Sequence, residues 1–311
     1  MPSPNPDELP SQADCADLSG PSCVLIFNAS DPSGIGGLAA DITAMASVGA
    51  HALPVVTGAY ARDTAQIFSH FALEEEAVDE QARAVLEDVE VAIIKVGFVG
   101  SAENLGRVAG IASDYPDIPV VAYMPSLSWW DEDPIEQYLE AFKDLLLPQT
   151  TVLVGSHSTL WRWLLPDWST ENRPSARDIA QAAHDFGVPY TLVTGMQAAD
   201  QSIENMLATP YEVLVKEKFT RLEAIFSGAG DTLSAALAAL LANGGELPQA
   251  ASEALCYLDR CLGNGFRPGM GHAIPDRLFW AQADPDHEIS ENPSDQPPAT
   301  PSHEPTPRPR P

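Results

Sequence analysis

Four residues in the last third of the chain combine a candidate phosphate-binding turn with a candidate base, Gly228-Ala229-Gly230-Asp231. The run that follows, 232–243, is rich in Ala and Leu, which predicts a helix that begins at the motif. Glycines let the backbone come close to a ligand, and the free N–H groups and dipole of a helix N-terminus favour an anion. An Asp at this point can accept the proton of a hydroxyl that attacks a phosphoryl group. The alternative for Asp231 is an ordinary residue near a helix cap.

A second glycine-rich segment, 28–37, directly follows the first predicted strand. It indicates either a ligand-contact loop or simply a tight turn. The chain has no G-x-x-x-x-G-K-[ST] motif, no G-x-G-x-x-G in a suitable context and no protein-kinase signature set. Any phosphate chemistry must therefore use a different kind of anion site.

Short β-branched runs alternate with helical patterns along the chain and would position these two segments. Strands are predicted at 24–27, 53–57, 91–96, 120–124, 151–154 and 190–193, with a closing pair at 211–216 and 222–226. Helices are predicted at 38–48, 74–88, 102–113, 135–147, 176–186, 231–243 and 247–264. Repeated strand–helix alternation predicts an α/β domain whose parallel sheet is covered by helices on both faces. Ligands then bind at the carboxyl ends of the strands.

The two ends of the chain differ in composition from this body. We expect residues 1–20 to form a disordered acidic leader and 282–311 a disordered, proline-rich acidic tail, which leaves 21–281 as one ordered domain. Because the tail has few apolar residues, its deletion is expected to leave activity and melting temperature nearly unchanged.

Charge and cysteine usage limit the possible partners. The formal net charge is −28, which argues against binding to nucleic acid or to an anionic membrane surface. No apolar stretch reaches the roughly 18–20 residues that span a bilayer, and the N-terminus has no signal-peptide pattern. The four cysteines have neither C-x-x-C nor zinc-site spacing, so we expect reduced thiols in a cytoplasmic protein.

The order of several motifs resembles one known family. Asp31-Pro-Ser-Gly-Ile-Gly-Gly-Leu-Ala-Ala-Asp41 resembles the D-P-S-G-G-A-G-I-Q-A-D motif of the hydroxymethylpyrimidine and phosphomethylpyrimidine kinases of thiamine biosynthesis. Lys95-Val-Gly-Phe98 is similar to that family's K-I-G-M, 227–236 to its H-G-T-G-C-T-L-S-A-A and 269–273 to its terminal G-H-G. The resemblance covers about 22–280 in unbroken order. The G-A-G-D form is similar to the wider ribokinase and pyridoxal-kinase superfamily, in which the Asp is the catalytic base.

This resemblance implies a three-layer α/β/α ribokinase-like fold with a central, mostly parallel sheet. It also implies that ATP with Mg²⁺ phosphorylates a small-molecule pyrimidine, either the alcohol or its monophosphate. The base would be Asp231, with the N–H groups of Gly228, Ala229 and Gly230 around the phosphoryl group. The implied substrate contacts are Asp31, Gly36, Gly37, Asp41, Arg62 and Phe98. The implied nucleotide contacts are Lys95, Thr194 and Gly195. Metal ligands stay unassigned, and a homodimer is expected.

Departures from the family pattern leave two alternatives open. Asp231 replaces the family's usual Cys and Arg62 its Gln, which favours a pyridoxal-type or other small-alcohol kinase. Tyr123, Leu160 and Thr194 stand where the family has Asp, Glu and Lys, which favours a non-catalytic pyrimidine-binding regulatory protein. Phe98 replaces a Met, a conservative apolar change.

The arginine at position 62 needs an anionic partner if it is buried. The sequence offers a protein carboxylate, such as Asp41 or Asp63, or the phosphate of a phosphomethylpyrimidine. With the phosphate as partner, Arg62→Gln should weaken the monophosphate about ten-fold while sparing the alcohol.

Overall fold

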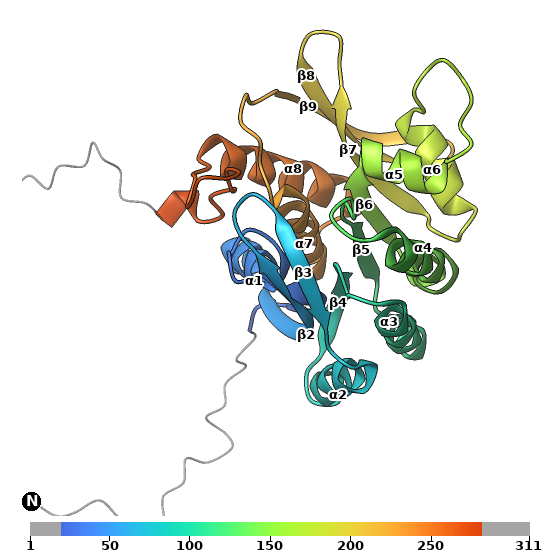
Figure 1. The fold of residues 1–311 in the computed structure, drawn as a ribbon, viewed down its shortest axis with the longest axis vertical. Coiled ribbons are helices and arrows are strands. Elements are labelled where there is room, and N and C mark those ends of the chain that lie inside the picture. The colour runs from blue at the N-terminus through green and yellow to red at the C-terminus, as the bar shows by residue number, and fades with distance from the viewer. Residues whose placement is uncertain (1–19, 282–311) are drawn as a thin grey trace, which may run out of the picture. The chain divides into compact units, whose positions relative to one another are not determined.

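The computed structural model describes residues 20–281 (Figure 1). The predicted leader and tail lie outside the described residues, apart from Gly20, so their boundaries stay predictions. Contacts divide the chain into two units, Met1–Phe279 and Trp280–Pro311. Of the second unit only 280 and 281 are described, and they belong to a short 3-10 turn, Phe279–Ala281. Among the described residues, no helix has the length and apolar character needed to cross a membrane.

A nine-stranded sheet runs through the described part of the first unit, in the order β3-β2-β1-β4-β5-β6-β7-β8-β9. The six strands from β2 to β7 are parallel, while β3, β8 and β9 are antiparallel to their neighbours. The strands are β1 (Cys23–Ser30), β2 (His51–Arg62), β3 (Ile67–Ala72), β4 (Val91–Val96), β5 (Val120–Met124), β6 (Val152–Ser156), β7 (Tyr190–Gln197), β8 (Ser202–Ala208) and β9 (Val213–Thr220).

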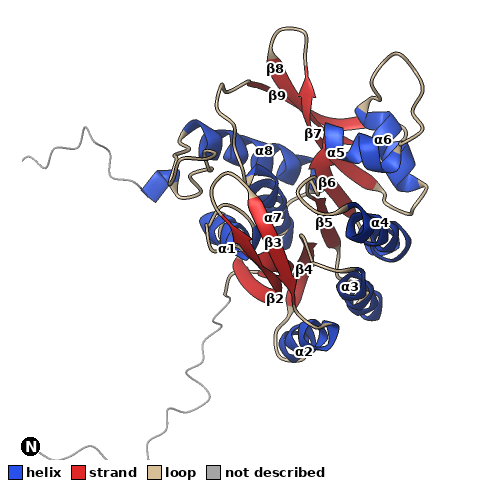
Figure 2. Ribbon diagram, in the orientation of Figure 1, coloured by secondary structure: helices blue, strands red, loops and turns tan. Residues whose placement is uncertain are grey.

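Helices cover both faces of this sheet (Figure 2). One face carries α1 (Gly37–Ser47), α7 (Ala229–Ala242) and α8 (Leu247–Gly263). The other carries α2 (Glu75–Leu86), α3 (Ala102–Asp114), α4 (Glu132–Ala141), α5 (His157–Leu164) and α6 (Ala176–His184). A π-helical turn, Phe142–Leu146, and a 3-10 turn, Leu147–Gln149, extend α4. The predicted three-layer α/β/α fold is confirmed.

The strand β1 shows how an apolar run serves both layers. Leu25 and Phe27 pack in the core under α2–α6, whereas Val24 and Ile26 pack in the core under α1, α7 and α8. Successive side chains of a strand point to opposite faces, so a continuous apolar run is what a strand between two helical layers requires. The same strand ends at the glycine-rich segment 28–37, which therefore emerges at the carboxyl edge of the sheet.

The closing pair of strands differs from the prediction. The prediction of a strand at 222–226 is wrong, because only an isolated bridge between Phe226 and Ala273 forms there. The hairpin instead pairs β8 with β9, and β9 overlaps the predicted strand at 211–216. Three further elements, β3, β8 and α5, were not predicted. Strand pairing depends on a partner far along the chain, so local propensity identifies such segments poorly.

Candidate functional site

The N-terminus of α7 is built on two close backbone approaches. Gly228 caps the helix with φ +82°, in the left-handed region, and a Cβ there would overlap the carbonyl oxygen of Ile35. A Cβ on Gly230 would overlap the hydroxyl and ring of Tyr123 from β5. Both positions therefore need glycine, because the helix N-terminus is pressed against the loop after β1 and against β5.

The same helix end presents unpaired donors. The first-turn N–H groups of a helix have no intrahelical acceptor, and here the first helical bond runs from Thr232 N–H to the Gly228 carbonyl, at 3.1 Å. The N–H groups of Ala229 and Gly230 lie ahead of it. Asp231 sits in this first turn with its side chain 17% exposed. A helix N-terminus of the kind that favours an anion and a reachable carboxylate thus occupy one place.

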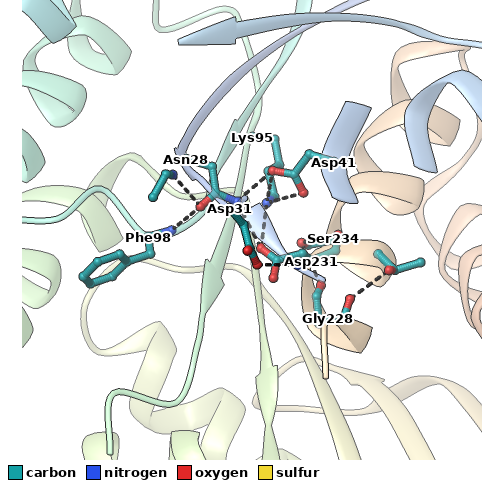
Figure 3. A network of polar contacts seen from close by, with 12 residues as sticks. Asn28, Asp31, Asp41, Lys95, Phe98, Gly228, Asp231 and Ser234 are labelled. Atoms are coloured by element: carbon teal, nitrogen blue, oxygen red, sulfur yellow. Dashed lines mark hydrogen bonds and ion pairs between the residues drawn. The ribbon is translucent and has the colours of Figure 1, made fainter. Parts of the chain in front are cut away.

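A buried ion pair lies beside Asp231. Lys95 of β4 and Asp41 of α1 both have fully buried side chains, and the lysine Nζ lies 2.8 and 2.7 Å from the two oxygens of Asp41. The same Nζ is 3.7 Å from Oδ1 of Asp231. Burial raises the pKa of Asp41 to about 6; the Lys95 charge opposes this shift and the Asp231 charge adds to it. Lys95 therefore balances the two carboxylates (Figure 3).

An amide that the sequence analysis did not assign completes this network. Asn28, at the carboxyl end of β1, donates from Nδ2 to Asp41 at 2.8 Å and to Asp231 at 3.0 Å. Its Oδ1 accepts the N–H groups of Ala29 and Phe98, at 2.9 and 3.2 Å. The available signal was a polar residue closing an otherwise apolar buried strand.

Asp31 shapes the loop after β1. Its buried carboxylate accepts the N–H and hydroxyl of Ser33 and the N–H of Gly36. Arg62, at the end of β2, reaches the same carboxylate at 3.3 Å with a side chain only 10% exposed. Its Nε also donates to the carbonyl oxygen of Asp63, at 3.2 Å. The arginine therefore has a protein carboxylate as its partner, and that partner is Asp31 rather than the carboxylate of Asp41 or Asp63.

Two glycines that the sequence predicts as substrate contacts, Gly36 and Gly37, allow this loop to lie against α7. A Cβ on Gly36 would lie 2.9 Å from Oδ2 of Asp231, so the absence of a side chain leaves room beside that oxygen. Gly37 has φ +58°, and a Cβ there would overlap the carbonyl oxygen of Ala29. The loop could not hold this course with larger residues at either position.

A second unassigned residue, Arg277, fastens the loop to the helix. Its buried guanidinium donates to the hydroxyl of Thr232 at 2.9 Å and to the carbonyl oxygens of Gly34 and Ile35. Burial lowers the pKa of this arginine, while the charges of Asp231 and Asp41 oppose that shift. Nothing local in the sequence marks Arg277, because all three acceptors lie far away along the chain.

Phe98 lies at the centre of a buried aromatic cluster. It is buried and lies between Tyr60, stacked at 5.8 Å, and the indoles of Trp129 and Trp130, at 5.5 and 5.2 Å edge to face. His70 joins the cluster, and burial lowers its pKa to about 4. Its Nε2 is buried without a hydrogen-bond partner among the described residues. Aromatic side chains of β2 and β3, Tyr60 and His70, therefore pack directly against Phe98.

The nucleotide residues predicted from the resemblance fall in two places. Thr194 and Gly195, on β7, line a cavity of about 420 Å³ whose wall includes residues of β8, β9 and α8. Gly195 has φ +74°, and its N–H donates to Oδ1 of Asn205 at 2.9 Å. Lys95 lies instead on β4, beside the carboxylates of Asp41 and Asp231. Strands β5 and β6 separate β4 from β7, which at the usual strand spacing is a distance of ~14 Å. The structure does not bring these three residues together.

Leu160, which stands in α5 where the family has Glu, carries no carboxylate, and neither does His157 at the start of that helix. His157 is buried with Nε2 2.8 Å from the carbonyl oxygen of Pro174, and Leu160 packs against Gly155. Within 20–281, no group of three or more His, Cys, Asp or Glu side chains is placed to hold a metal ion. The described residues therefore do not form a preassembled Mg²⁺ site.

A three-layer α/β fold and a helix that begins at a glycine-rich turn with a carboxylate in its first turn are features of the ribokinase-like phosphotransferases. Comparison with known proteins then gives the family. A model described as phosphomethylpyrimidine kinase matches residues 31–276, and the chain belongs to that family. The resemblance read from the motifs is confirmed, and so is the prediction of a kinase.

Individual relatives agree with this assignment. The hydroxymethylpyrimidine/phosphomethylpyrimidine kinase of Mycobacterium leprae is 26% identical, over 83% of this chain and 95% of that protein. The one from Streptomyces coelicolor is 28% identical, over 84% and 96%. Among solved structures, the pyridoxal kinase of Bacillus subtilis has a TM-score of 0.75 at 18% identity, covering 85% of this chain and 100% of that one. The phosphomethylpyrimidine kinase of Clostridium difficile has a TM-score of 0.63 at 21% identity, covering 76% and 97%. These two structural likenesses concern the fold alone.

Proposed function

We propose that this protein transfers the γ-phosphoryl group of ATP to hydroxymethylpyrimidine, to its monophosphate, or to both, in thiamine biosynthesis. One observation carries the proposal: the carboxylate of Asp231, in the first turn of α7, lies beside Gly36 in the loop between β1 and α1. The substrate class is supported by the names of the Mycobacterium leprae and Streptomyces coelicolor relatives and by a rice relative named a probable thiamine biosynthetic bifunctional enzyme.

The chemistry assigned to Asp231 is that of a general base. Its Oδ2 accepts the proton of the substrate hydroxyl as the hydroxyl oxygen forms a bond to the γ-phosphorus. The bond from that phosphorus to the β–γ bridging oxygen breaks, and its electron pair leaves with ADP. The N–H groups of Gly228, Ala229 and Gly230 stabilise the charge of the transferring group, as donors fixed in advance.

Nucleotide binding is assigned to the cavity at Thr194 and Gly195. Its apolar residues, such as Phe226 and Leu255, suit a purine ring, and the polar Thr194 contributes from within β7. Mg²⁺ usually takes one or two carboxylates together with substrate phosphates and water. The described residues hold no ready cage, so we expect the ion to be bound mainly through the nucleotide phosphates.

A pyridoxal-type kinase is the second candidate. The observation that favours it is the pair Arg62–Asp31, a charged wall beside Asp231 where the family has a neutral amide. A regulatory protein without turnover is the third, and Tyr123 and Leu160 favour it because neither supplies the carboxylate that the family has at that position.

One experiment separates these functions. The purified protein is incubated with ATP and Mg²⁺ and with hydroxymethylpyrimidine, its monophosphate or pyridoxal, and ADP is measured. The proposal expects ADP only with the pyrimidines. Turnover of pyridoxal alone would assign the second candidate. Pyrimidine binding in calorimetry without ADP from any alcohol would assign the third.

We further propose a homodimer in the cytoplasm, with neither nucleic acid nor membrane as partner. The described cysteines, Cys23, Cys256 and Cys261, are all free thiols, which suits a reducing compartment. The edge strand β3 exposes Phe68 and Phe71, which supports self-association. Sedimentation equilibrium of the wild type tests the assembly, and a monomer at micromolar concentration would contradict it.

A further inference from the structure

The side chain of Asn28 uses every hydrogen-bonding position that an amide has. Its oxygen accepts two backbone N–H groups, from Ala29 and Phe98, and its nitrogen donates to two carboxylates, of Asp41 and Asp231. The reversed orientation would place the amide oxygen against both carboxylates and the NH₂ group against two N–H donors. The network therefore allows a single orientation. With 1% exposure, the residue has no water to substitute for any of these bonds.

This single orientation makes the two oxygens of Asp231 different. Oδ1 receives the Asn28 N–H at 3.0 Å and faces the Lys95 ammonium at 3.7 Å. Oδ2 instead points to Gly36, where a Cβ would stand only 2.9 Å away. One oxygen is thus held by the protein, and the other borders the space left by a glycine of the loop after β1.

We propose that Asn28 is a positioning residue for phosphoryl transfer. By holding Oδ1, it aims Oδ2 of Asp231 at the substrate hydroxyl and keeps the carboxylate from turning about its Cβ–Cγ bond. The inference rests on the proposed function, in which Asp231 is the base. Asn28 itself is not catalytic, because Asp231 stands between it and the place of reaction.

A neutral amide suits this place for an electrostatic reason. Asp41 and Asp231 are two carboxylates that share one nearby ammonium, Lys95. An amide joins them with two donated hydrogen bonds and adds no charge, whereas an apolar residue would leave the facing oxygens without those donors. A carboxylate at position 28 would add a third negative charge beside the Lys95 ammonium that Asp41 and Asp231 already share.

Two variants test the role. Asn28→Asp keeps an oxygen for the Ala29 and Phe98 N–H groups but loses both donated bonds, and Asn28→Ala loses the whole amide. Each is expected to lower kcat by about 10–100-fold, the usual effect of a misplaced reacting group. The KM for the pyrimidine should change by less than about threefold, because Asn28 does not touch the substrate. If Asn28→Asp does not fold, Asn28→Ala carries the test.

Asn104 supplies the matched control. It is another fully buried amide, and its Nδ2 donates to the carbonyl oxygens of Thr57, Leu73 and Val99. Asn104→Ala should lower the urea midpoint about as much as Asn28→Ala while leaving kcat nearly unchanged. Equal losses of kcat in both variants would show a general effect of stability and would overturn the positioning role.

A double-mutant cycle shows whether Asn28 acts through Asp231. In the Asp231→Asn background, adding Asn28→Ala should change kcat by no more than about twofold, the usual limit of additivity error. A base that is absent cannot be misaligned, so the two losses must not multiply. Multiplying losses would mean that Asn28 acts elsewhere, which overturns the proposal.

The failure of this inference can be told apart from a failure of the proposed function. A wild type that forms no ADP with any pyrimidine refutes the proposed function. An active wild type whose Asn28 variants keep kcat refutes only the positioning role. Urea unfolding gives a readout independent of activity. The shift of the urea midpoint in the double variant Asn28→Ala, Asp231→Ala should be smaller than the sum of the shifts in the two single variants. Strict additivity would show that the hydrogen bond between Asn28 and Asp231 contributes nothing.

Discussion

Lys95 and Asp41 form an ion pair with both side chains fully buried, at 2.7 Å between Nζ and Oδ2. The pair connects β4 of the sheet to α1, directly behind the candidate base. Burying two charges is costly, so its value lies in holding these elements in one arrangement rather than in net stability.

Removing one partner of this ion pair should strongly destabilise the fold. Lys95→Met is expected to lower the free energy of unfolding by about 3–5 kcal/mol, because it leaves a buried carboxylate without its cation. Lys218→Met is the matched control, since Lys218 pairs with Asp200 while both side chains are about half exposed; its effect on stability should be far smaller, because water screens exposed pairs. Urea unfolding measures both, and equal costs would contradict this account.

The raised pKa of Asp41 predicts a pH dependence of stability. Its pKa moves from 3.8 to about 6 on folding, so between these values the folded state binds the proton more tightly than the unfolded state does. This contribution is fully present below about pH 4 and is lost as the pH rises toward 6. Relative to Asp41→Asn, which cannot titrate, the wild type should lose stability over this window. If the free energies of unfolding of the two proteins, measured in urea, changed with pH in parallel, the raised pKa of Asp41 would be refuted.

Asp231→Asn tests the base with an almost isosteric change. Turnover should fall by about 10²–10⁴-fold, while the melting temperature and the affinity for the pyrimidine stay close to wild type. Steady-state kinetics with ADP detection, together with calorimetry of pyrimidine binding, make the measurement. Near-wild-type turnover would remove Asp231 from the mechanism.

The pairing of Arg62 with Asp31 changes the expectation for Arg62→Gln. Because the partner is a protein carboxylate that shapes the loop, kcat/KM should fall for the alcohol and the monophosphate by factors within about twofold of each other. Kinetics on both substrates decide this. A loss confined to the monophosphate would instead show that the arginine leaves Asp31 to bind the substrate phosphate.

Gly230→Ala should destabilise although it adds a good helix former. The new Cβ would overlap the ring of Tyr123, so the melting temperature should fall, and Tyr123→Leu in the same chain should recover part of the loss. Gly110→Ala in α3 is the control, with nothing within 4 Å of the added Cβ; it should stabilise by about 0.5–1 kcal/mol. A stable Gly230→Ala would contradict the close approach of α7 to β5.

The sequence by itself determined the features that depend on neighbouring residues. The apolar run at 24–27 and the Ala- and Leu-rich run at 232–243 have the composition of a buried strand and a helix, so the α/β class and a helix that begins at the candidate site, Gly228–Asp231, could be predicted from them. The order of motifs between Asp31 and His272 was enough to indicate the family.

Tertiary structure decided which residues far apart along the chain become hydrogen-bond partners. Asn28 and Asp231 are 203 positions apart, and Arg277 and Ile35 are 242 apart, yet each pair shares a hydrogen bond. The pairing of β8 with β9, missed in favour of 222–226, is of the same kind. No local pattern encodes such contacts, because they exist only after the parallel strands bring their carboxyl ends to one edge and the helices close over it.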